Sequence, residues 1–407
     1  MEVPKRPFDG SAPWGCDDGL GRVDLDSDLV RFPLDRDGRL SQLPSKRGGK
    51  TLTLAGMPFP RGNAMPNSRS RLAKATTFVR FAAQQIAARA RVAREVTESA
   101  ALPFTIAAPS TVLTAADPEW RDAGLRVKAG EHFVVSARGA VWLSKPLSVV
   151  MQPRACLWVR IAGAPEIHKP ADHDHVFVAW ADGEVQLFLK ALSEWASPAG
   201  DLLAGDRPAM AGEIAVRVAP TDLPATAPLA PDGWSPLWRM GDGTVYARGD
   251  AAGEIRIHSH GDVGILQTEV NHPITPATRL QWSWKVERLP SRLAEDTVLT
   301  HDYLSVAVEF DNGQDLTFMW SAGLPHDHVF TCPLNWWCER ETHWVVRTPR
   351  DGVGVWLDED RGLWADTQTA YGVRPARAVR LWLIANSIFQ RQTATATIRD
   401  LRLVEAV

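Results

Sequence analysis

Short runs that alternate polar and apolar residues recur along most of the chain after residue 100, separated by Gly and Pro. Successive side chains of a strand point to opposite faces, so this alternation is typical of strands with one buried face. Clear examples begin at Gly212, Trp282 and Thr395. Strands of this length with turn residues between them predict an all-β fold built from two antiparallel β-sandwiches.

The chain is long enough for more than one hydrophobic core. Its 407 residues exceed the roughly 250 to 300 residues at which one core stops growing. Hydrophobic residues make up 45% and charged residues 23% of the chain, which is typical of a globular protein. We expect an irregular N-terminal arm and a helix over residues 1–100, a sandwich over 101–220, a Pro/Ala linker over 221–234 and a second sandwich over 235–407.

One long helix is predicted from Arg71 to about Ser99, because this segment is rich in Ala and contains neither Gly nor Pro. Its arginines are left for solvent, for an acidic partner or for a membrane surface. Packing of one face on the helix's own domain is the usual source of stability for such a helix, and we expect that here. The predicted apolar face consists of Leu72, Phe78, Phe81, Ala82, Ile86, Val92 and Val96.

Several classes of function are disfavoured. The net charge of −3 and the dispersed arginines give no nucleic-acid stripe, and no apolar run is long enough to span a membrane. The N-terminus lacks the apolar core of a secretory signal, so we expect a cytoplasmic protein. The oligomeric state is left open, a homo-oligomer included. The cysteines favour reduced thiols because no CxxC spacing appears, and they are Cys16, Cys156, Cys332 and Cys338.

The pentapeptide HDHVF occurs twice, beginning at His173 and at His326. In a strand, His173 and His175 would share one face, as would His326 and His328, so that each copy could form a metal-binding or proton-transfer pair. The alternative is that both copies merely begin strands. A third HxH pair starts at His258. None of the three has a clear third ligand, so we expect no cofactor and assign no metal ligand, while a divalent metal stays a minor alternative.

The segment from Pro325 to Trp344 mixes titratable side chains with large aromatic ones. Pockets for small molecules need apolar walls and a few polar groups, and a carboxylate beside an imidazole can perform acid-base chemistry. The alternative is an exposed polar loop whose Trp residues cover a sheet edge. The candidate catalytic residues are His326, His328, Glu339, His301 and Asp302, and the candidate substrate-binding residues are Trp320, Trp336, Trp337, Arg340 and Tyr303.

The central region resembles the calcium-dependent galactose-binding lectins of bacteria. The similarity rests on the order of LWVRIAG, FVAW, ADGEVQLFL and GEIAVRV, and covers about ninety residues. It implies a galactose-binding-like sandwich. In that family an Asn/Asp-rich loop after the penultimate strand supplies calcium and sugar oxygens. Here the loop reads ALSEWASPAGDLL and contains no Asn, so we do not expect calcium-dependent sugar binding.

The C-terminal region contains WSWKV, His301-Asp302 followed by LSVAVEF, LTFMWS, Trp364 and Asp366 ahead of Tyr371-Gly372, and the closing IRDLRL. On these motifs it resembles the uncharacterised DUF3047 family. It implies a jelly-roll-like sandwich and no established reaction. The segment PHDHVFTCPLNWWCERETHW departs from the family pattern.

Two classes of function remain. The first is an enzyme of lyase, hydratase, isomerase or hydrolase type, which moves protons on a small-molecule substrate in a Trp-lined pocket. The second is a non-catalytic protein that binds a carbohydrate or glycoside by stacking it on Trp. The chain has 17 Trp against 3 Tyr, and Trp supplies a large apolar surface together with one N–H donor, so its composition suits either class.

Overall fold

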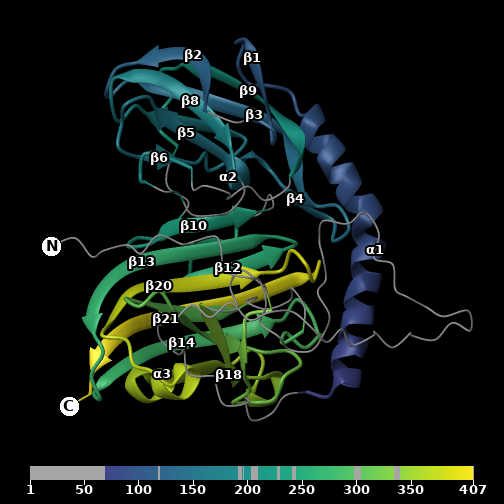
Figure 1. The fold of residues 1–407 in the computed structure, drawn as a ribbon, viewed down its shortest axis with the longest axis vertical. Coiled ribbons are helices and arrows are strands. Elements are labelled where there is room, and N and C mark those ends of the chain that lie inside the picture. Colours follow the sequence, from purple (N-terminus) through teal and green to yellow (C-terminus); the bar gives the residue numbers. More distant parts are fainter. Residues whose placement is uncertain are drawn as a thin grey trace, which may run out of the picture. The chain divides into compact units, whose positions relative to one another are not determined.

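The computed structural model describes residues 69–117, 120–190, 195, 197–202, 210–226, 230–240, 244–297, 304–333 and 340–406 (Figure 1). The N-terminal arm expected from the sequence lies outside these residues. Helices and strands within them confirm the all-β class, with one long helix and two β-sandwiches. None of the helices in the described part combines the length and the apolar character needed to cross a membrane.

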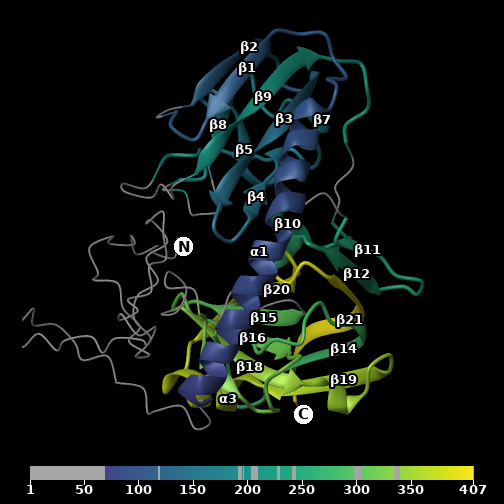
Figure 2. The ribbon, with the colours of Figure 1, turned by 90° about the vertical axis from the view of Figure 1, so that its right-hand side faces the viewer.

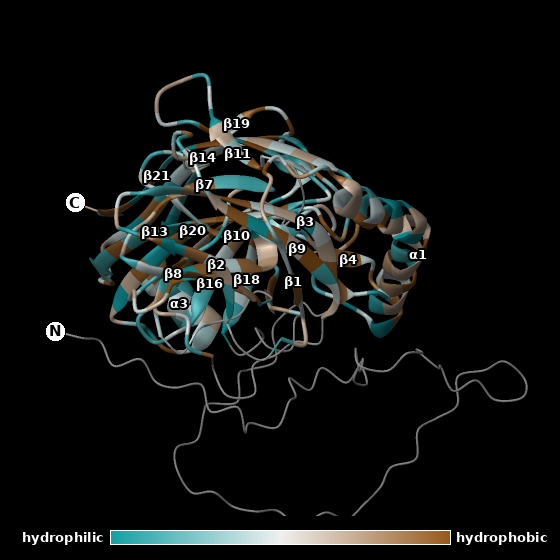
Figure 3. Cartoon of the chain, turned by 90° about the horizontal axis from the view of Figure 1, so that it is seen from above, coloured by the Kyte–Doolittle hydropathy of each residue, from teal (hydrophilic) through white to brown (hydrophobic). Residues whose placement is uncertain are grey.

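Helix α1 (Arg71–Ala101) begins where the sequence predicted it, with the Ser70 side chain accepting a hydrogen bond from the backbone N–H of Ala73. Figure 3 shows that hydrophilic and hydrophobic residues are mixed along it. The predicted apolar face is partly wrong, because Leu72 is 78% and Ile86 is 66% exposed. Phe81 and Val92 of the predicted face are buried, and they are joined by side chains that were not predicted, three of them polar: Thr77, Gln85, Ala88 and Ser99.

The polar residues on the buried side of α1 are satisfied by backbone carbonyls. Gln85 Nε2 donates to the carbonyl of Phe389 at 2.6 Å, and Ser99 Oγ donates to the carbonyl of Gly139 at 3.1 Å. A buried polar group costs little once it is hydrogen-bonded. The prediction from hydropathy alone was therefore wrong for part of the buried face of this helix.

The first sandwich consists of two sheets. One has the strand order β1-β9-β3-β4, with β7 paired to β3, and the other has the order β2-β8-β5-β6. All pairings are antiparallel, as expected. The bounds are β1 (Ser110–Thr114), β2 (Arg121–Val127), β3 (His132–Ser144), β4 (Val149–Met151), β5 (Leu157–Ile161), β6 (Ile167–His168), β7 (Asp174–Val178), β8 (Gly183–Leu189) and β9 (Ala211–Pro220), with α2 (Pro153–Cys156) before β5.

Alternation along the strands of the first sandwich determines what faces its core. Leu157, Val159 and Ile161 of β5 are fully buried in the core, while Trp158 and Arg160 between them are only partly buried. Phe188 of β8 is paired with Trp158 across the two strands. Because directly opposed residues point to the same side, the face of this sheet that turns away from the core carries aromatic and polar side chains.

The second sandwich also has two sheets. Their strand orders are β10-β13-β20-β15-β16-β18-β17 and β11-β12-β21-β14-β19, and the paired strands β14 and β19 are visible in Figure 2. The bounds are β10 (Ser235–Met240), β11 (Tyr246–Arg248), β12 (Ile255–His260), β13 (Val263–Pro273), β14 (Thr278–Arg288), β15 (Ser305–Phe310), β16 (Asp315–Trp320), β17 (Val329–Thr331), β18 (Glu341–Arg347), β19 (Trp356–Gly362), β20 (Arg377–Asn386) and β21 (Thr393–Glu405), with η1 (Pro349–Asp351) and α3 (Leu363–Tyr371) beside them.

One pair in the seven-stranded sheet corrects the expectation of a purely antiparallel fold. Strands β16 and β18 are parallel, with Asp315 opposite Glu341 and Thr317 opposite His343. Strand β17, which lies between them in sequence, pairs antiparallel with β18 at the edge of the sheet. The segment from Pro325 to Trp344, for which an exposed loop was the alternative expectation, therefore contains β17 and the beginning of β18.

Candidate functional site

An aromatic cluster covers the outward side of the β2-β8-β5-β6 sheet. We call Trp120, Trp158, Phe188 and Trp195 the aromatic face. The rings of Trp120 and Trp195 are stacked with centroids 5.6 Å apart and planes at 26°. Trp158 meets Trp195 edge to face at 5.1 Å, and Phe188 lies 5.5 Å from Trp120. The three Trp side chains are partly exposed, so the cluster is not enclosed in the core of the sandwich.

Polar side chains lie next to these rings. The Arg160 guanidinium is 4.4 Å from the centre of the Trp120 ring, and its Nε donates to Gln186 Oε1 at 2.8 Å. Gln186 Nε2 in turn donates to Asp122 Oδ1 at 2.7 Å. Burial lowers the pKa of Arg160, while Asp201 and Asp122 raise it. A fixed row of donors and acceptors therefore borders the aromatic face.

The three indole N–H groups are used differently. Trp120 Nε1 donates to the Gly200 carbonyl at 3.0 Å, and Trp158 Nε1 donates to the Lys190 carbonyl at 3.2 Å. These bonds hold both rings in one orientation. Among the described residues Trp195 Nε1 has no hydrogen-bond partner, although the atom is buried. A buried donor without a partner is unusual and calls for an explanation.

The second HDHVF copy does not place its histidines on one strand face. Asp327 has a φ of 59°, and β17 begins only at Val329, so His326 and His328 belong to a turn. His326 is about half exposed and lies 2.9 Å from Asp327. His328 is 3% exposed and faces Asp296 at 3.6 Å. The turn thus separates the two imidazoles into different surroundings, and the expectation of a shared face is wrong for this copy.

Asp296, the carboxylate beside His328, is held in its charged form. Burial raises the pKa of Asp296, but hydrogen bonds from His328 and Thr297 and the charge of Arg69 outweigh it and lower the pKa to about 2. Arg69 Nη1 donates to Asp296 Oδ1 at 2.7 Å. This group of charges stabilises the beginning of α1 and the segment before β17.

The first HDHVF copy enters β7 at Asp174. Asp174 accepts hydrogen bonds from Ser136 and from the buried Arg138, the latter at 3.0 Å. His175 packs on Phe177 with ring centres 4.1 Å apart, and its Nδ1 accepts from the backbone of Ala171. Burial lowers the pKa of His175 to about 4. This copy has the contacts of a packed strand beginning, which was the alternative interpretation.

The third HxH pair behaves as the strand period predicts. His258 and His260 are both on the exposed side of β12. His260 Nδ1 is 2.8 Å from Thr393 Oγ1. Among the described residues, neither of them belongs to a group of three side chains that could hold a metal ion.

A second concentration of polar groups lies on one side of the seven-stranded sheet. Asp315 and Glu341 are opposed across β16 and β18, and Thr317 Oγ1 donates to Glu341 Oε1 at 3.2 Å. Arg340 pairs with Asp315 at 3.0 Å and with Glu309 at 2.9 Å. Burial and the nearby Glu341 raise the pKa of Asp315 well above its usual range.

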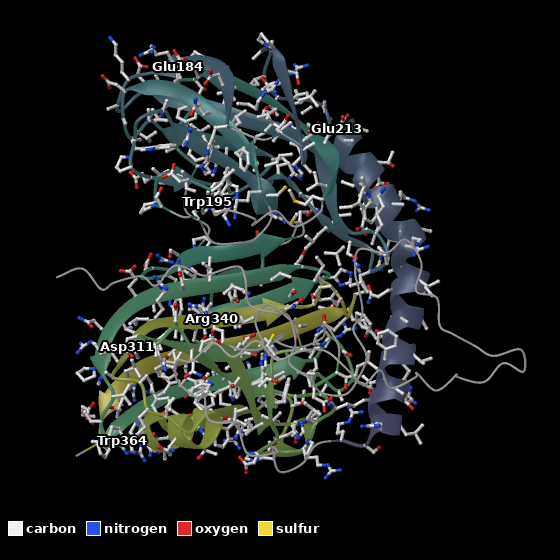
Figure 4. The ribbon with its side chains drawn as sticks, in the orientation of Figure 1. Glu184, Trp195, Glu213, Asp311, Arg340 and Trp364 are labelled. Carbon is white, nitrogen blue, oxygen red and sulfur yellow. The ribbon has the colours of Figure 1, made fainter. Side chains whose placement is uncertain are left out.

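The remaining predicted site residues are placed as follows. Trp320 is fully buried in the core of the second sandwich, with its ring edge to face on Trp284 at 5.5 Å, so it is a packing residue rather than a surface for substrate. Arg340, labelled in Figure 4, pairs with carboxylates and lies 5.6 Å from the Trp382 ring. The other predicted residues lie outside the described part of the chain: His301, Asp302, Tyr303, Trp336, Trp337 and Glu339.

The aromatic face was missed at the level of sequence because its residues come from separate segments. Trp158 lies in β5, Trp120 precedes β2, and Trp195, labelled in Figure 4, belongs to the connection after β8. A usable signal existed in the strand LWVRI, where Trp and Arg occupy the positions between buried aliphatic residues. Large aromatic and cationic residues at outward positions indicate a surface with a binding role.

Residues 232–402 match DUF3047, a family described as a protein of unknown function. No curated protein matches the sequence. Similar solved structures include the N-terminal domain of EclA, a PllA-like lectin, at 20% identity over 28% of this chain and 95% of that one, with a TM-score of 0.21.

Two further similar structures belong to carbohydrate-binding proteins or their domains. The tandem CBM22 domain from Paenibacillus barcinonensis Xyn10C is 10% identical over 75% of this chain and 93% of that chain, with a TM-score of 0.22. A structure of carbohydrate-binding modules from the β-sandwich superfamily is 8% identical over 72% of this chain and 98% of that one, with a TM-score of 0.16. Both resemblances stated from the sequence, to DUF3047 and to a lectin sandwich, are thus found among the matches.

Proposed function

We propose that this protein binds a carbohydrate on the aromatic face of its first sandwich and does not transform it. The observation that carries the proposal is the stacked pair Trp120 and Trp195 beside the hydrogen-bonded row of Arg160, Gln186 and Asp122. Sugars offer an apolar C–H face together with hydroxyl groups at the rim. A partly exposed indole surface with polar groups at its border is complementary to both.

The polar row supports the proposal through its geometry. Arg160 and Gln186 are held by each other and by strands β5 and β8, so little side-chain entropy is lost when a ligand binds. Asp122 offers carboxylate oxygens that accept from sugar hydroxyls. The buried Trp195 Nε1 is unsatisfied within the described residues and adds an N–H donor to the aromatic face.

The position of Trp195 also fits this function. It lies in the segment ALSEWASPAGDLL, which corresponds to the loop that holds calcium and sugar in the lectin family that this region resembles. The segment has lost the amide and acidic pattern of that loop and has a Trp instead. We infer that stacking replaces metal-mediated recognition at this end of the sandwich.

The enzyme hypothesis from the sequence receives less support from the described residues. His326 is exposed beside Asp327, whereas His328 is buried beside Asp296. General acid-base catalysis needs groups within hydrogen-bond reach of one substrate, and these two imidazoles have different partners and different exposure. The aromatic face contains ring surfaces and a fixed polar row, which favours binding.

The test is a titration of the full chain with soluble oligosaccharides of cellulose, xylan, galactan and pectin. Binding is measured by calorimetry and by the change in Trp fluorescence. We expect saturable binding of at least one of them, and Trp195→Ala to raise its Kd at least about tenfold, which corresponds to about 1.4 kcal/mol. Trp364→Ala, a partly exposed Trp of α3 in the other sandwich, is the matched control and should bind like the wild type.

Chromatography of the same mixtures after long incubation separates the two classes of function. Unchanged oligosaccharides support a binding protein. Shortened or unsaturated products would replace the proposal by the enzyme hypothesis. Equal affinity of the wild type and of Trp195→Ala would remove the aromatic face from the site.

A further inference from the structure

Three donor side chains of different chemistry converge at the edge of the seven-stranded sheet, away from the aromatic face. Glu341 and His343 are two residues apart on β18, so they point to the same side. Cys332 follows β17, and its backbone N–H donates to the carbonyl of Glu341 at 3.0 Å. The antiparallel register of β17 and β18 therefore continues to Cys332 and brings its side chain beside Glu341.

The donor atoms are close enough to share one ion. One ligand atom each of Cys332, Glu341 and His343 lies within 4.8 Å of the other two, and Glu341 Oε2 is 3.4 Å from His343 Nε2. In a tetrahedral zinc site, bonds of about 2.0 to 2.3 Å place neighbouring donor atoms about 3 to 4 Å apart. The distance between Glu341 Oε2 and His343 Nε2 already has that spacing.

All three side chains of the cluster are buried. Cys332 is 2%, Glu341 6% and His343 0% exposed. Ionised groups this far from water are normally paired or bound to a metal. Once a divalent ion is bound, the deprotonated thiol of Cys332 and the carboxylate of Glu341 would together balance its two positive charges.

The neighbouring residues orient the donors. Thr317 Oγ1 donates to Glu341 Oε1 at 3.2 Å, which leaves Oε2 directed toward His343. The ring of Phe330 is stacked on the imidazole of His343, with centroids 4.8 Å apart and planes at 18°. Hydrogen bonds and packing around the ligands are what fixes ligand orientation in protein metal sites.

We propose that Cys332, Glu341 and His343 form a zinc site that ties the edge strand β17 to β18. A sulfur, a nitrogen and a carboxylate oxygen are a donor set that suits Zn²⁺, while Mg²⁺ and Ca²⁺ prefer oxygen donors alone. Binding removes the thiol proton of Cys332, which passes to solvent, and the sulfur, imidazole nitrogen and carboxylate oxygen each donate an electron pair to the ion. Three protein ligands leave a fourth tetrahedral position for a water molecule or another ligand.

This site was not expected from the sequence, from which we predicted no cofactor and a reduced thiol at Cys332. The ligands do not form a short motif, because Cys332 and His343 are brought together only by the pairing of two strands. The proposal is independent of carbohydrate binding, since its residues belong to the other sandwich.

The test is metal analysis of the full purified chain, together with absorption spectroscopy after loading with Co²⁺. We expect one zinc ion per chain and a sulfur-to-cobalt charge-transfer band in the near ultraviolet. Cys332→Ser should abolish that band and lower zinc affinity at least about 100-fold, and Thr317→Val should lower it about 10- to 100-fold through the loss of ligand orientation.

Cys156→Ser is the matched control, because Cys156 is a buried thiol of the first sandwich. It should keep both the band and the affinity. If Cys332→Ser does not fold, Glu341→Gln is the alternative variant, because it preserves side-chain size and leaves all the thiols in place. We expect it to bind zinc more weakly than the wild type. No sulfur band in the wild type, or equal zinc affinity in wild type and Glu341→Gln, would reduce the cluster to a contact between the side chains of Glu341 and His343.

Discussion

The indole of Trp195 is stacked on that of Trp120 with their centroids 5.6 Å apart. Trp195 comes from the connection after β8 and Trp120 from the segment before β2, so the contact joins two otherwise separate segments on the outward side of one sheet. Aromatic pairs of this kind contribute about 0.5 to 1.5 kcal/mol beyond the area that they bury.

The stacking energy can be measured by a double-mutant cycle. We expect Trp120→Leu and Trp195→Leu each to lower the free energy of unfolding, and the two changes together to cost less than their sum by about 0.5 to 1.5 kcal/mol. Urea unfolding of the wild type, the single variants and the double variant gives this coupling energy. Strict additivity would show that the rings do not interact in solution.

The burial observed along α1 predicts effects of different size on stability for two aliphatic residues. Val92 is fully buried and Ile86 is 66% exposed. Val92→Ala should lower the free energy of unfolding by about 1 to 3 kcal/mol because it leaves a small cavity, while Ile86→Ala should change it by less than about 0.5 kcal/mol. Chemical denaturation distinguishes them, and a larger loss from Ile86→Ala would restore the face predicted from hydropathy.

Asp296 should contribute to stability in a defined pH range. Its pKa of about 2 in the folded protein is below the roughly 3.8 expected for an unfolded chain. The contribution is therefore complete above about pH 4 and is lost as the pH falls toward 2. Asp296→Asn should lower the free energy of unfolding at pH 7 by about 1 to 3 kcal/mol. Between about pH 4 and pH 2 the free energy of unfolding should then fall less steeply in the variant than in the wild type.

The matched control for that experiment is Asp232→Asn. Asp232 pairs with Arg248 at 2.5 Å, but its side chain is 87% exposed, and such pairs contribute little. The acid dependence of this variant should follow that of the wild type. Parallel acid curves for Asp296→Asn and the wild type would contradict the assignment of Asp296.

The lowered pKa of His175 predicts a second loss of stability, at a higher pH than the loss that involves Asp296. Its pKa is lowered to about 4 in the folded protein, while that of an unfolded histidine is about 6.5. The unfolded chain therefore binds the proton first, and stability declines as the pH falls from about 6.5 to 4. His175→Gln should remove this component. The change in unfolding free energy between pH 7.5 and pH 5 measures it, and an unchanged slope in the variant would contradict it.

The strands and the helix could be predicted from the sequence because their signals are local. Alternation identified β9, β14 and β21, and the Ala-rich segment without Gly or Pro identified α1. The parallel pairing of β16 with β18 could not be predicted in this way. It depends on which strands meet in the sheet, and a strand's own residues do not specify whether its neighbour runs parallel or antiparallel.

The candidate sites were harder to predict than the fold. The repeated HDHVF drew attention to histidine pairs, but a single left-handed residue, Asp327 with φ of 59°, turned His326 and His328 toward different neighbours. The residues that do converge, Trp120 with Trp195 and Cys332 with His343, lie in different segments of the sequence. Their proximity follows from sheet register, and a motif of a few residues does not contain that information.

The most direct test of carbohydrate binding is a calorimetric titration of the wild type and Trp195→Ala with the oligosaccharide that binds the wild type most tightly. The proposed site predicts a Kd at least about tenfold higher for the variant, with the folded state confirmed by its circular dichroism. Equal Kd values for two folded proteins would contradict it.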